Sequence, residues 1–211
     1  MEQRQYWNKV AEKKEFTTPF QIGEFEKYVK KDSVILDVGC GYGRTLAQLY
    51  DNGYKNLIGI DFARNMIERG REQFPYLDLR VKEDERIALP DNSVDAVILF
   101  AVLTCIVSNE EQSGLIAEIK RVLKPGGILY VNDFLLNMDE RNELRYSEYA
   151  EKYGTYGVFE LPEGALLRHH DEKWLEELFQ PFEKKSYEQL IFTTMNGNKS
   201  NGFFYIGQLF V

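Results

Sequence analysis

The chain has 211 residues, 44% of them hydrophobic, and a formal net charge of −8 at pH 7. This length predicts one domain, residues 1–211, with a full hydrophobic core, and the acidic balance argues against nucleic-acid binding, which requires a basic surface. Because the chain has neither an apolar run of about 18 residues nor a signal peptide's apolar region at its start, we expect no membrane span and a cytoplasmic location.

The most informative stretch is residues 34–44, where an apolar run containing Asp37 is followed by glycines at every second position. The run predicts a buried parallel strand, and the pattern after it predicts a helix. Glycines at such a turn let the backbone approach a ligand, since no Cβ blocks it. The spacing is GxGxG, with Arg44 in place of the last glycine of a dinucleotide site, and Asp37 repels a pyrophosphate but suits a cationic ligand. The alternative is a tight turn that binds nothing.

A second apolar strand, residues 56–61, ends in Asp61, eighteen residues after Gly43. This interval is close to the roughly 20 residues expected before a carboxylate that binds ribose, and a carboxylate can accept two hydroxyls at once. The alternative is that Asp61 only caps the helix predicted over residues 63–73.

Further apolar runs continue the alternation of strands and helices. Strands are predicted over residues 77–81, 95–100 and 128–131, and a helix over residues 116–123 precedes a turn at 124–127. Near the C-terminus, residues 186–194 and 202–211 predict an antiparallel hairpin whose polar turn region includes Asn196.

Taken together, residues 33–133 resemble the class I S-adenosylmethionine (SAM) dependent methyltransferases, in particular small-molecule methyltransferases of the ubiquinone/menaquinone type. Four motifs carry the resemblance in the right order: LDVGCGYG, GIDFARNMI, VKEDERIALPDNSVDAVI and EIKRVLKPGGILYV. The resemblance implies an α/β fold with a doubly wound, Rossmann-like, seven-stranded sheet, mostly parallel with an antiparallel C-terminal edge hairpin. It also implies methyl transfer from SAM to a small-molecule acceptor, with S-adenosylhomocysteine as product.

The same resemblance assigns roles to residues. Gly39 and Gly41 would contact the methionine end of SAM, with Asp37 near its amino group, and Asp61 would bind the ribose hydroxyls. Glu83 or Asp84 would contact adenine, although both depart from the usual pattern. The implied cofactor site consists of Asp37, Gly39, Cys40, Gly41, Asp61, Phe62, Glu83, Asp84, Phe100 and Ala101.

For two of these residues, core packing is the competing interpretation. Phe62 would cover adenine, and Phe100 with Ala101 would form the wall beside the transferable methyl group, but either phenylalanine can equally belong to the hydrophobic core. Cys40 and Cys105 are expected to be small apolar fillers, because their spacing suits neither a zinc site nor a disulfide scaffold.

Two segments outside these motifs are expected to shape the acceptor site. In relatives of this type, a leader such as residues 1–32 folds over the cofactor as a lid; Trp7 is expected to pack in the core, whereas Tyr6 and Phe16 can either pack or close the site. Residues 135–168 exceed an ordinary connection and would form a substrate cap. The cap's aromatic side chains can line an acceptor pocket or pack as a helix face: Tyr146, Tyr149, Tyr153, Tyr156 and Phe159.

Both histidines of the chain, His169 and His170, follow this cap, and Asp171 is expected to cap the helix at residues 173–179. Adjacent residues diverge in a helix or strand, so we expect no metal site. One histidine facing the site can serve as a general base, and the alternative is a structural role in a loop.

Two other functions compete with methyl transfer. A noncatalytic SAM-binding regulatory module would have the same cofactor motifs. Positioning alone can drive methyl transfer, so no residue of the sequence is strictly required for chemistry and the motifs do not distinguish this module from an enzyme. A nicotinamide-dependent oxidoreductase would share the sheet but is disfavoured by Arg44 and Asp37.

Overall fold

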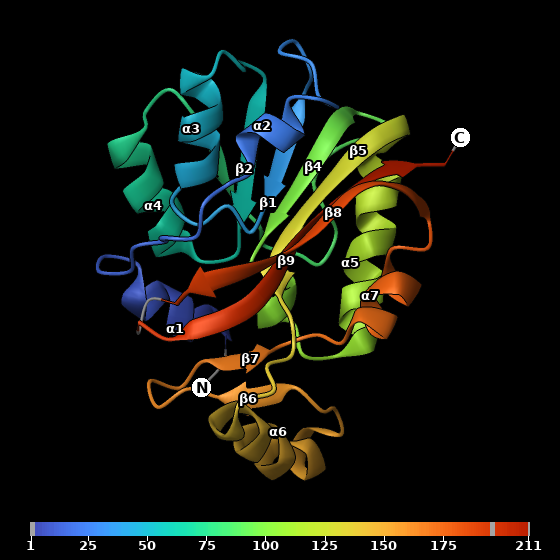
Figure 1. The fold of residues 1–211 in the computed structure, drawn as a ribbon. Coiled ribbons are helices and arrows are strands. Elements are labelled where there is room, and N and C mark those ends of the chain that lie inside the picture. Colours follow the sequence, from blue (N-terminus) through green and yellow to red (C-terminus); the bar gives the residue numbers. More distant parts are fainter. Residues whose placement is uncertain (1–2, 195–196, 211) are drawn as a thin grey trace.

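The computed structural model describes residues 3–194 and 197–210, and its main feature is a seven-stranded sheet (Figure 1). The strand order is β3-β2-β1-β4-β5-β9-β8, in which β1 to β5 are parallel and β9 and β8 are antiparallel. The strands are β1 (Ile35–Val38), β2 (Leu57–Asp61), β3 (Asp78–Val81), β4 (Val94–Phe100), β5 (Leu123–Phe134), β8 (Phe182–Thr193) and β9 (Lys199–Leu209). The predicted fold class is therefore confirmed.

Helices cover both faces of this sheet, which is why its parallel strands are apolar on both sides. Figure 1 shows α2, α3 and α4 on one face and α5 and α7 on the other. The helices are α1 (Gln3–Val10), α2 (Ile22–Phe25), α3 (Arg44–Asp51), α4 (Arg64–Gln73), α5 (Asn109–Val122), α6 (Glu140–Tyr153) and α7 (Glu172–Leu178), with a short 3-10 helix, η1 (Leu103–Cys105).

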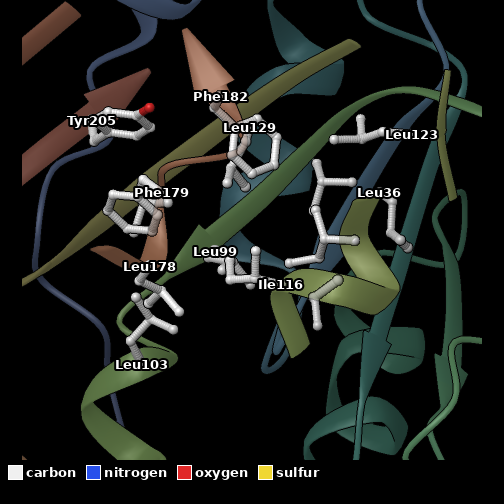
Figure 2. Close-up of a cluster of buried hydrophobic side chains, with 14 of the residues drawn as sticks. Leu36, Leu99, Leu103, Ile116, Leu123, Leu129, Leu178, Phe179, Phe182 and Tyr205 are labelled. Carbon is white, nitrogen blue, oxygen red and sulfur yellow. The ribbon is translucent and has the colours of Figure 1, made fainter. Parts of the chain in front are cut away.

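Successive residues of each central strand enter different cores. Leu36 of β1 and Leu99 of β4 pack with Ile116 of α5 and Leu178 of α7 (Figure 2). On the opposite face, neighbouring strand residues pack against α2 and α3, and this second cluster includes Ile35, Ala96, Ile98, Phe25 and Leu46. The sheet thus fixes the positions of the strand ends, where the site lies.

The segment after β5 forms a small unit of its own. Helix α6 is followed by a two-stranded sheet, β6 (Val158–Glu160) and β7 (Leu166–Arg168). Figure 1 shows this unit beyond the end of the main sheet, beside α1. Asp139 caps α6 by accepting a hydrogen bond from the Asn142 N–H, and Gly154 ends it in the left-handed region. The long segment predicted as residues 135–168 is therefore a helix and a hairpin.

Some boundaries differ from those predicted. The fifth strand begins at Leu123, before the predicted turn, because Leu123 pairs with Val94 across an irregular register. The C-terminal strands begin earlier, at Phe182 and Lys199, while Asn196 and Val211 lie outside the described residues. Asp171 caps α7 as predicted, accepting from the Trp174 N–H at 2.9 Å. Across residues 3–194 and 197–210, no helix combines the length and apolarity that crossing a membrane requires.

Candidate active site

The glycine turn lies between β1 and α3, at the carboxyl end of β1. Gly39, Gly41 and Gly43 all have positive φ, at 74°, 55° and 87°. At Gly41, a Cβ would also lie 2.7 Å from Cε2 of Phe16, so this position combines a left-handed backbone with a close approach. The turn therefore presents bare backbone where side chains are excluded, and its Gly39 and Cys40 N–H groups donate to the Ile60 carbonyl at 2.8 and 3.1 Å.

Asp61, at the carboxyl end of β2, connects two parts of the site. One carboxylate oxygen accepts from the Gly41 N–H at 2.8 Å, and the other accepts from the Ala63 N–H at 2.7 Å. The N-cap position of α4 is Ala63, so Asp61 is not the capping residue that the alternative interpretation required. Burial raises the pKa of Asp61, while its two backbone hydrogen bonds act in the opposite direction.

Asp37 is the second carboxyl group beside the turn, and only 1% of it is exposed. Burial, and then repulsion from Asp61, raise the pKa of Asp37 to about 7, while Arg44 partly offsets them. Its Oδ1 atom is buried with no hydrogen-bond partner among the described residues. An orphaned buried carboxyl oxygen favours a donor from outside the chain, above all a cationic one.

One cavity of about 240 Å³ brings most of the predicted site together. The sequence-predicted residues that line it are Asp37, Gly39, Cys40, Gly41, Asp61, Phe62, Phe100, Ala101 and His169. Burial raises the pKa of the Cys40 thiol, and the same cause raises that of Cys105, so both thiols are poor nucleophiles, in line with the expected role as fillers.

The structure does not bring Glu83 or Asp84 to this cavity. The Glu83 carboxylate is exposed and pairs with Arg64 at 2.7 Å and with Arg4 at 4.0 Å, and Asp84 is exposed as well. A run of charged residues in a loop looks the same in sequence whether it faces a ligand or solvent. An adenine contact from this loop stays a prediction.

The two histidines occupy different environments. His170 does not line the cavity; it is buried, its Nε2 lies 2.9 Å from Nε2 of Gln112, and burial lowers its pKa to about 3. His169 lines the cavity, and burial, followed by repulsion from Arg145, holds its pKa well below its usual value. The geometry thus gives His170 the structural role that the alternative interpretation required.

The hydrogen bonds of His169 also assign its tautomer. Asn137 Oδ1 accepts from the Asn201 N–H at 2.7 Å, so Asn137 Nδ2 is the donor that lies 3.1 Å from His169 Nδ1. The Tyr146 hydroxyl lies 2.6 Å from the same nitrogen. Because Nδ1 faces two donors, it is an acceptor, and the proton sits on Nε2. In this tautomer neutral His169 is a hydrogen-bond donor at Nε2, and a general-base role for it stays a prediction.

Of the five aromatic residues expected in the cap, only Phe159 lines the cavity. Tyr146 is fully buried and holds His169, Tyr153 donates a hydrogen bond to Glu160, and Tyr156 is 49% exposed. The prediction that these aromatic side chains line the acceptor pocket therefore holds only for Phe159. Tyr146 points from α6 toward the domain, which agrees with the alternative of a packed helix face.

In the leader, Tyr6 is buried at 1% exposure, whereas Trp7 is half-buried and lines the cavity with Phe16. The Phe16 ring stacks on Tyr42 with their centroids 5.4 Å apart. Tyr6, for which packing and closing the site were both open, therefore packs. Trp7, which was expected in the core, divides its surface between a small apolar cluster and the cavity.

Three arginines in the cavity wall were missed by sequence reasoning. Arg44 donates to the Thr18 carbonyl at 2.9 Å and lies 5.4 Å from the Phe100 ring centroid. Arg141 and Arg145 come from α6. In the sequence, Arg44 was only a departure from a glycine pattern, while the spacing of four between the other two was a usable signal for a shared helix face.

Comparisons with known proteins agree with this geometry. Residues 36–131 match the family described as a methyltransferase domain. The chain is 31% identical over 115 residues to the eEF1A lysine and N-terminal methyltransferase of Bos taurus, covering 50% of this chain and 16% of that protein. It is 33% identical over 111 residues to a tRNA N(3)-cytidine methyltransferase of Mus musculus, covering 47% of this chain and 28% of that protein.

A solved structure is similar over nearly the whole chain. A SAM-dependent methyltransferase from Methanosarcina mazei superimposes with a TM-score of 0.85 at 28% identity, covering 92% of this chain and 100% of that one. The fold and these matches identify residues 36–131 as a class I SAM-dependent methyltransferase domain, whose methyl donor is SAM. The match is to the family at large, and membership of the ubiquinone/menaquinone group stays a prediction.

The residues at the glycine turn fit this cofactor. SAM carries an ammonium group and a sulfonium, and the orphaned oxygen of Asp37 lies at a turn that excludes side chains. Asp61 uses one acceptor site on each oxygen for the backbone, which leaves further lone pairs for hydroxyl groups.

Proposed function

We propose that this chain transfers a methyl group from SAM to a small-molecule acceptor bound in the same cavity. The observation that carries the proposal is the continuity of that cavity. At one end lie Asp37, Asp61 and the glycine turn, and at the other lie Phe159 and His169 of the segment after β5. The relatives named above act on a protein and on tRNA by their names. The small acceptor is supported here by the single cavity that joins both ends and by the net charge of −8.

Within this proposal, each part of the donor has a partner in the chain. Asp37 binds the ammonium group, Gly39 and Gly41 let the backbone of the turn contact the methionine end, and Asp61 binds the ribose. Phe62 covers adenine, and Phe100 with Ala101 forms the wall beside the methyl group. Either Glu83 or Asp84 reaches adenine only if their loop moves toward the cavity.

Two segments close the site in this proposal. Residues 1–32 act as a lid, supported by Trp7 and Phe16 in the cavity wall, and residues 135–168 act as the substrate cap, supported by Arg145 and Phe159. Both segments exclude water from the space between donor and acceptor.

SAM supplies a methyl group on a sulfonium: a lone pair of the acceptor forms the new bond to carbon, and the breaking C–S bond leaves its electron pair on sulfur. The chain's part is to bind, orient and dehydrate the reacting groups, and such positioning can lower a barrier by about 7 to 11 kcal/mol. In the tautomer described above, His169 donates a hydrogen bond and does not remove a proton from the acceptor. The acceptor atom must therefore reach the site with a free lone pair.

The test begins with a thermal-shift panel of SAM, S-adenosylhomocysteine, NAD and NADP. A ligand at about 100 times its dissociation constant stabilises a protein by roughly 2.7 kcal/mol. We expect a shift with the first two only, and a shift with NAD or NADP alone would favour the oxidoreductase. Labelled SAM with a metabolite library then distinguishes an enzyme from a regulatory module, which would bind SAM without forming product.

A further inference from the structure

The end of the cavity formed by the segment after β5 is basic, while the glycine-turn end holds two buried acids, Asp37 and Asp61, beside Arg44. Arg141 and Arg145 lie four residues apart on α6, which places them on one face of that helix, and both line the cavity. Among residues 3–194 and 197–210, the only carboxylates in the lining are Asp37 and Asp61, both at the glycine turn. The basic end therefore holds positive charge with no lining acid beside it in the part of the chain that the structure describes.

Arg145 is the more constrained of the two. Its guanidinium carbon lies 3.4 Å from the ring centroid of Phe159, so the charged group stacks on an aromatic face. Its Nε atom is buried without a hydrogen-bond partner, and no ion pair of Arg145 occurs within residues 3–194 and 197–210. Burial lowers the pKa of Arg145, and the neighbouring charge of Arg141 adds to that effect.

Arg141 is only weakly compensated. Its Nε lies 3.8 Å from Asp139, and that carboxylate also serves as the N-cap of α6. A guanidinium that is partly buried without its acid costs free energy, and a bound anion is the usual way to recover it. Two arginines on one face make a favourable fork for a planar or tetrahedral oxyanion.

His169 adds a third donor to this end. Its ring packs edge-to-face against Phe159 with centroids 4.8 Å apart, and its protonated nitrogen is Nε2 because Tyr146 and Asn137 occupy Nδ1. The apolar remainder of the wall comes from Phe134, Leu161 and Leu167. This end of the cavity thus offers N–H donors around an apolar surface.

We propose that the acceptor is an oxyanion, carrying a carboxylate or phosphate group that binds Arg141 and Arg145 with His169 as a further donor, and an apolar body that packs on Phe159. This inference rests on the proposed function. The oxyanion is a handle and not the methylated group, because charge-assisted hydrogen bonds occupy its lone pairs. Another nucleophilic atom of the same molecule then faces the methyl group.

The experiment measures binding of three small probes to the full chain in the presence of S-adenosylhomocysteine. The probes are benzoate, phenyl phosphate and the neutral benzamide, and the measurement is calorimetric. We expect benzoate or phenyl phosphate to bind at least about tenfold more tightly than benzamide, and the tighter of the two identifies the group. Equal binding of all three probes, or no binding, overturns the inference.

Substitutions of the two arginines test whether they bind the oxyanion. Arg145→Gln is expected to weaken oxyanion binding about ten- to a hundredfold, because a charged hydrogen bond is lost. Arg80→Gln is the matched control, since Arg80 pairs with Asp78 on β3 and does not line the cavity. If Arg145→Gln does not fold, the half-exposed Arg141→Gln carries the same test. Unchanged oxyanion binding in the folded arginine variant contradicts the proposal.

SAM affinity separates the two proposals. Arg145→Gln and Arg141→Gln are expected to bind SAM as the parent does, because neither residue lies at the glycine turn. A parent chain that binds SAM and fails with the oxyanions refutes only the acceptor class. A parent chain that does not bind SAM refutes the proposed function itself.

Discussion

Replacement of Asp37 by asparagine is expected to stabilise the unliganded protein while weakening SAM binding. The carboxyl group is buried, its Oδ1 has no partner, and its pKa is raised from 3.8 to about 7. Since one pKa unit corresponds to about 1.36 kcal/mol, keeping this group ionised above pH 7 costs on the order of 2 to 4 kcal/mol of folding free energy. Asparagine has the same shape and no charge, so the variant avoids that cost.

The pH dependence has a defined sign. The folded-state pKa is higher than the unfolded one, so the folded protein holds the proton more tightly. Stability from this group is fully present below about pH 4 and is lost as the pH rises through about 7. His170, whose pKa falls to about 3, opposes this trend below its usual value of 6.5. The difference between the parent and Asp37→Asn therefore isolates Asp37: it should be near zero at pH 4 and largest at pH 8.

Urea unfolding at pH 4, 6 and 8 measures the stability, and calorimetry at pH 8 measures SAM affinity, which should fall about ten- to a hundredfold. Asp95→Asn is the control, because Asp95 lies outside the cavity lining and accepts from Lys124 and the Val34 N–H. That variant should lose stability and keep its SAM affinity. An Asp37→Asn protein that is less stable than the parent at pH 8, or that binds SAM equally well, would refute the reasoning.

Three further substitutions test other parts of the site. Asp61→Ala should weaken SAM binding about ten- to a hundredfold and lower the free energy of unfolding by about 2 to 5 kcal/mol, because two backbone N–H groups lose their acceptor; unchanged affinity by calorimetry would remove Asp61 from the site. Gly41→Ala should weaken SAM binding more than Gly53→Ala, since both have positive φ but only Gly41 also faces Phe16; equal affinities would argue against a close approach at the turn. His170→Ala should lower the unfolding free energy by about 1 to 3 kcal/mol in urea titrations, because Gln112 loses a buried partner, and a selective loss of SAM binding would contradict its structural role.

The sheet and the glycine turn were predictable because their signals are local. A buried parallel strand needs an uninterrupted apolar run, and a strand-to-helix turn with positive φ needs glycine, so residues 34–44 determine both. Asp61 was also predictable, since its position at the carboxyl end of the strand beside β1 follows from the parallel pairing of β1 and β2. These are features that a few neighbouring residues decide by themselves.

The basic end of the cavity was not predictable, because it depends on how a cap docks. The helix periodicity of Tyr146, Tyr149 and Tyr153 indicates one face, but only the contacts of α6 show that Tyr146 packs inward onto His169. The same docking brings Arg145 over Phe159, fourteen residues later in the chain. Likewise, nothing local shows that Glu83 pairs with Arg64 in place of a ligand.

The two ends of the cavity carry opposite charge imbalances, and this opposition links binding to turnover. Asp37 is an under-compensated acid and Arg145 an under-compensated base, so each end is relieved by a ligand of the opposite sign. In the proposed complex, the cationic donor and the anionic acceptor lie in one cavity and attract each other, and that attraction is reciprocal. Methyl transfer converts the sulfonium to a neutral thioether, which removes the positive charge nearest the acceptor. With the proposed acceptor, we expect the methylated product to bind less tightly beside S-adenosylhomocysteine than the acceptor binds beside SAM, so the reaction itself would favour product release.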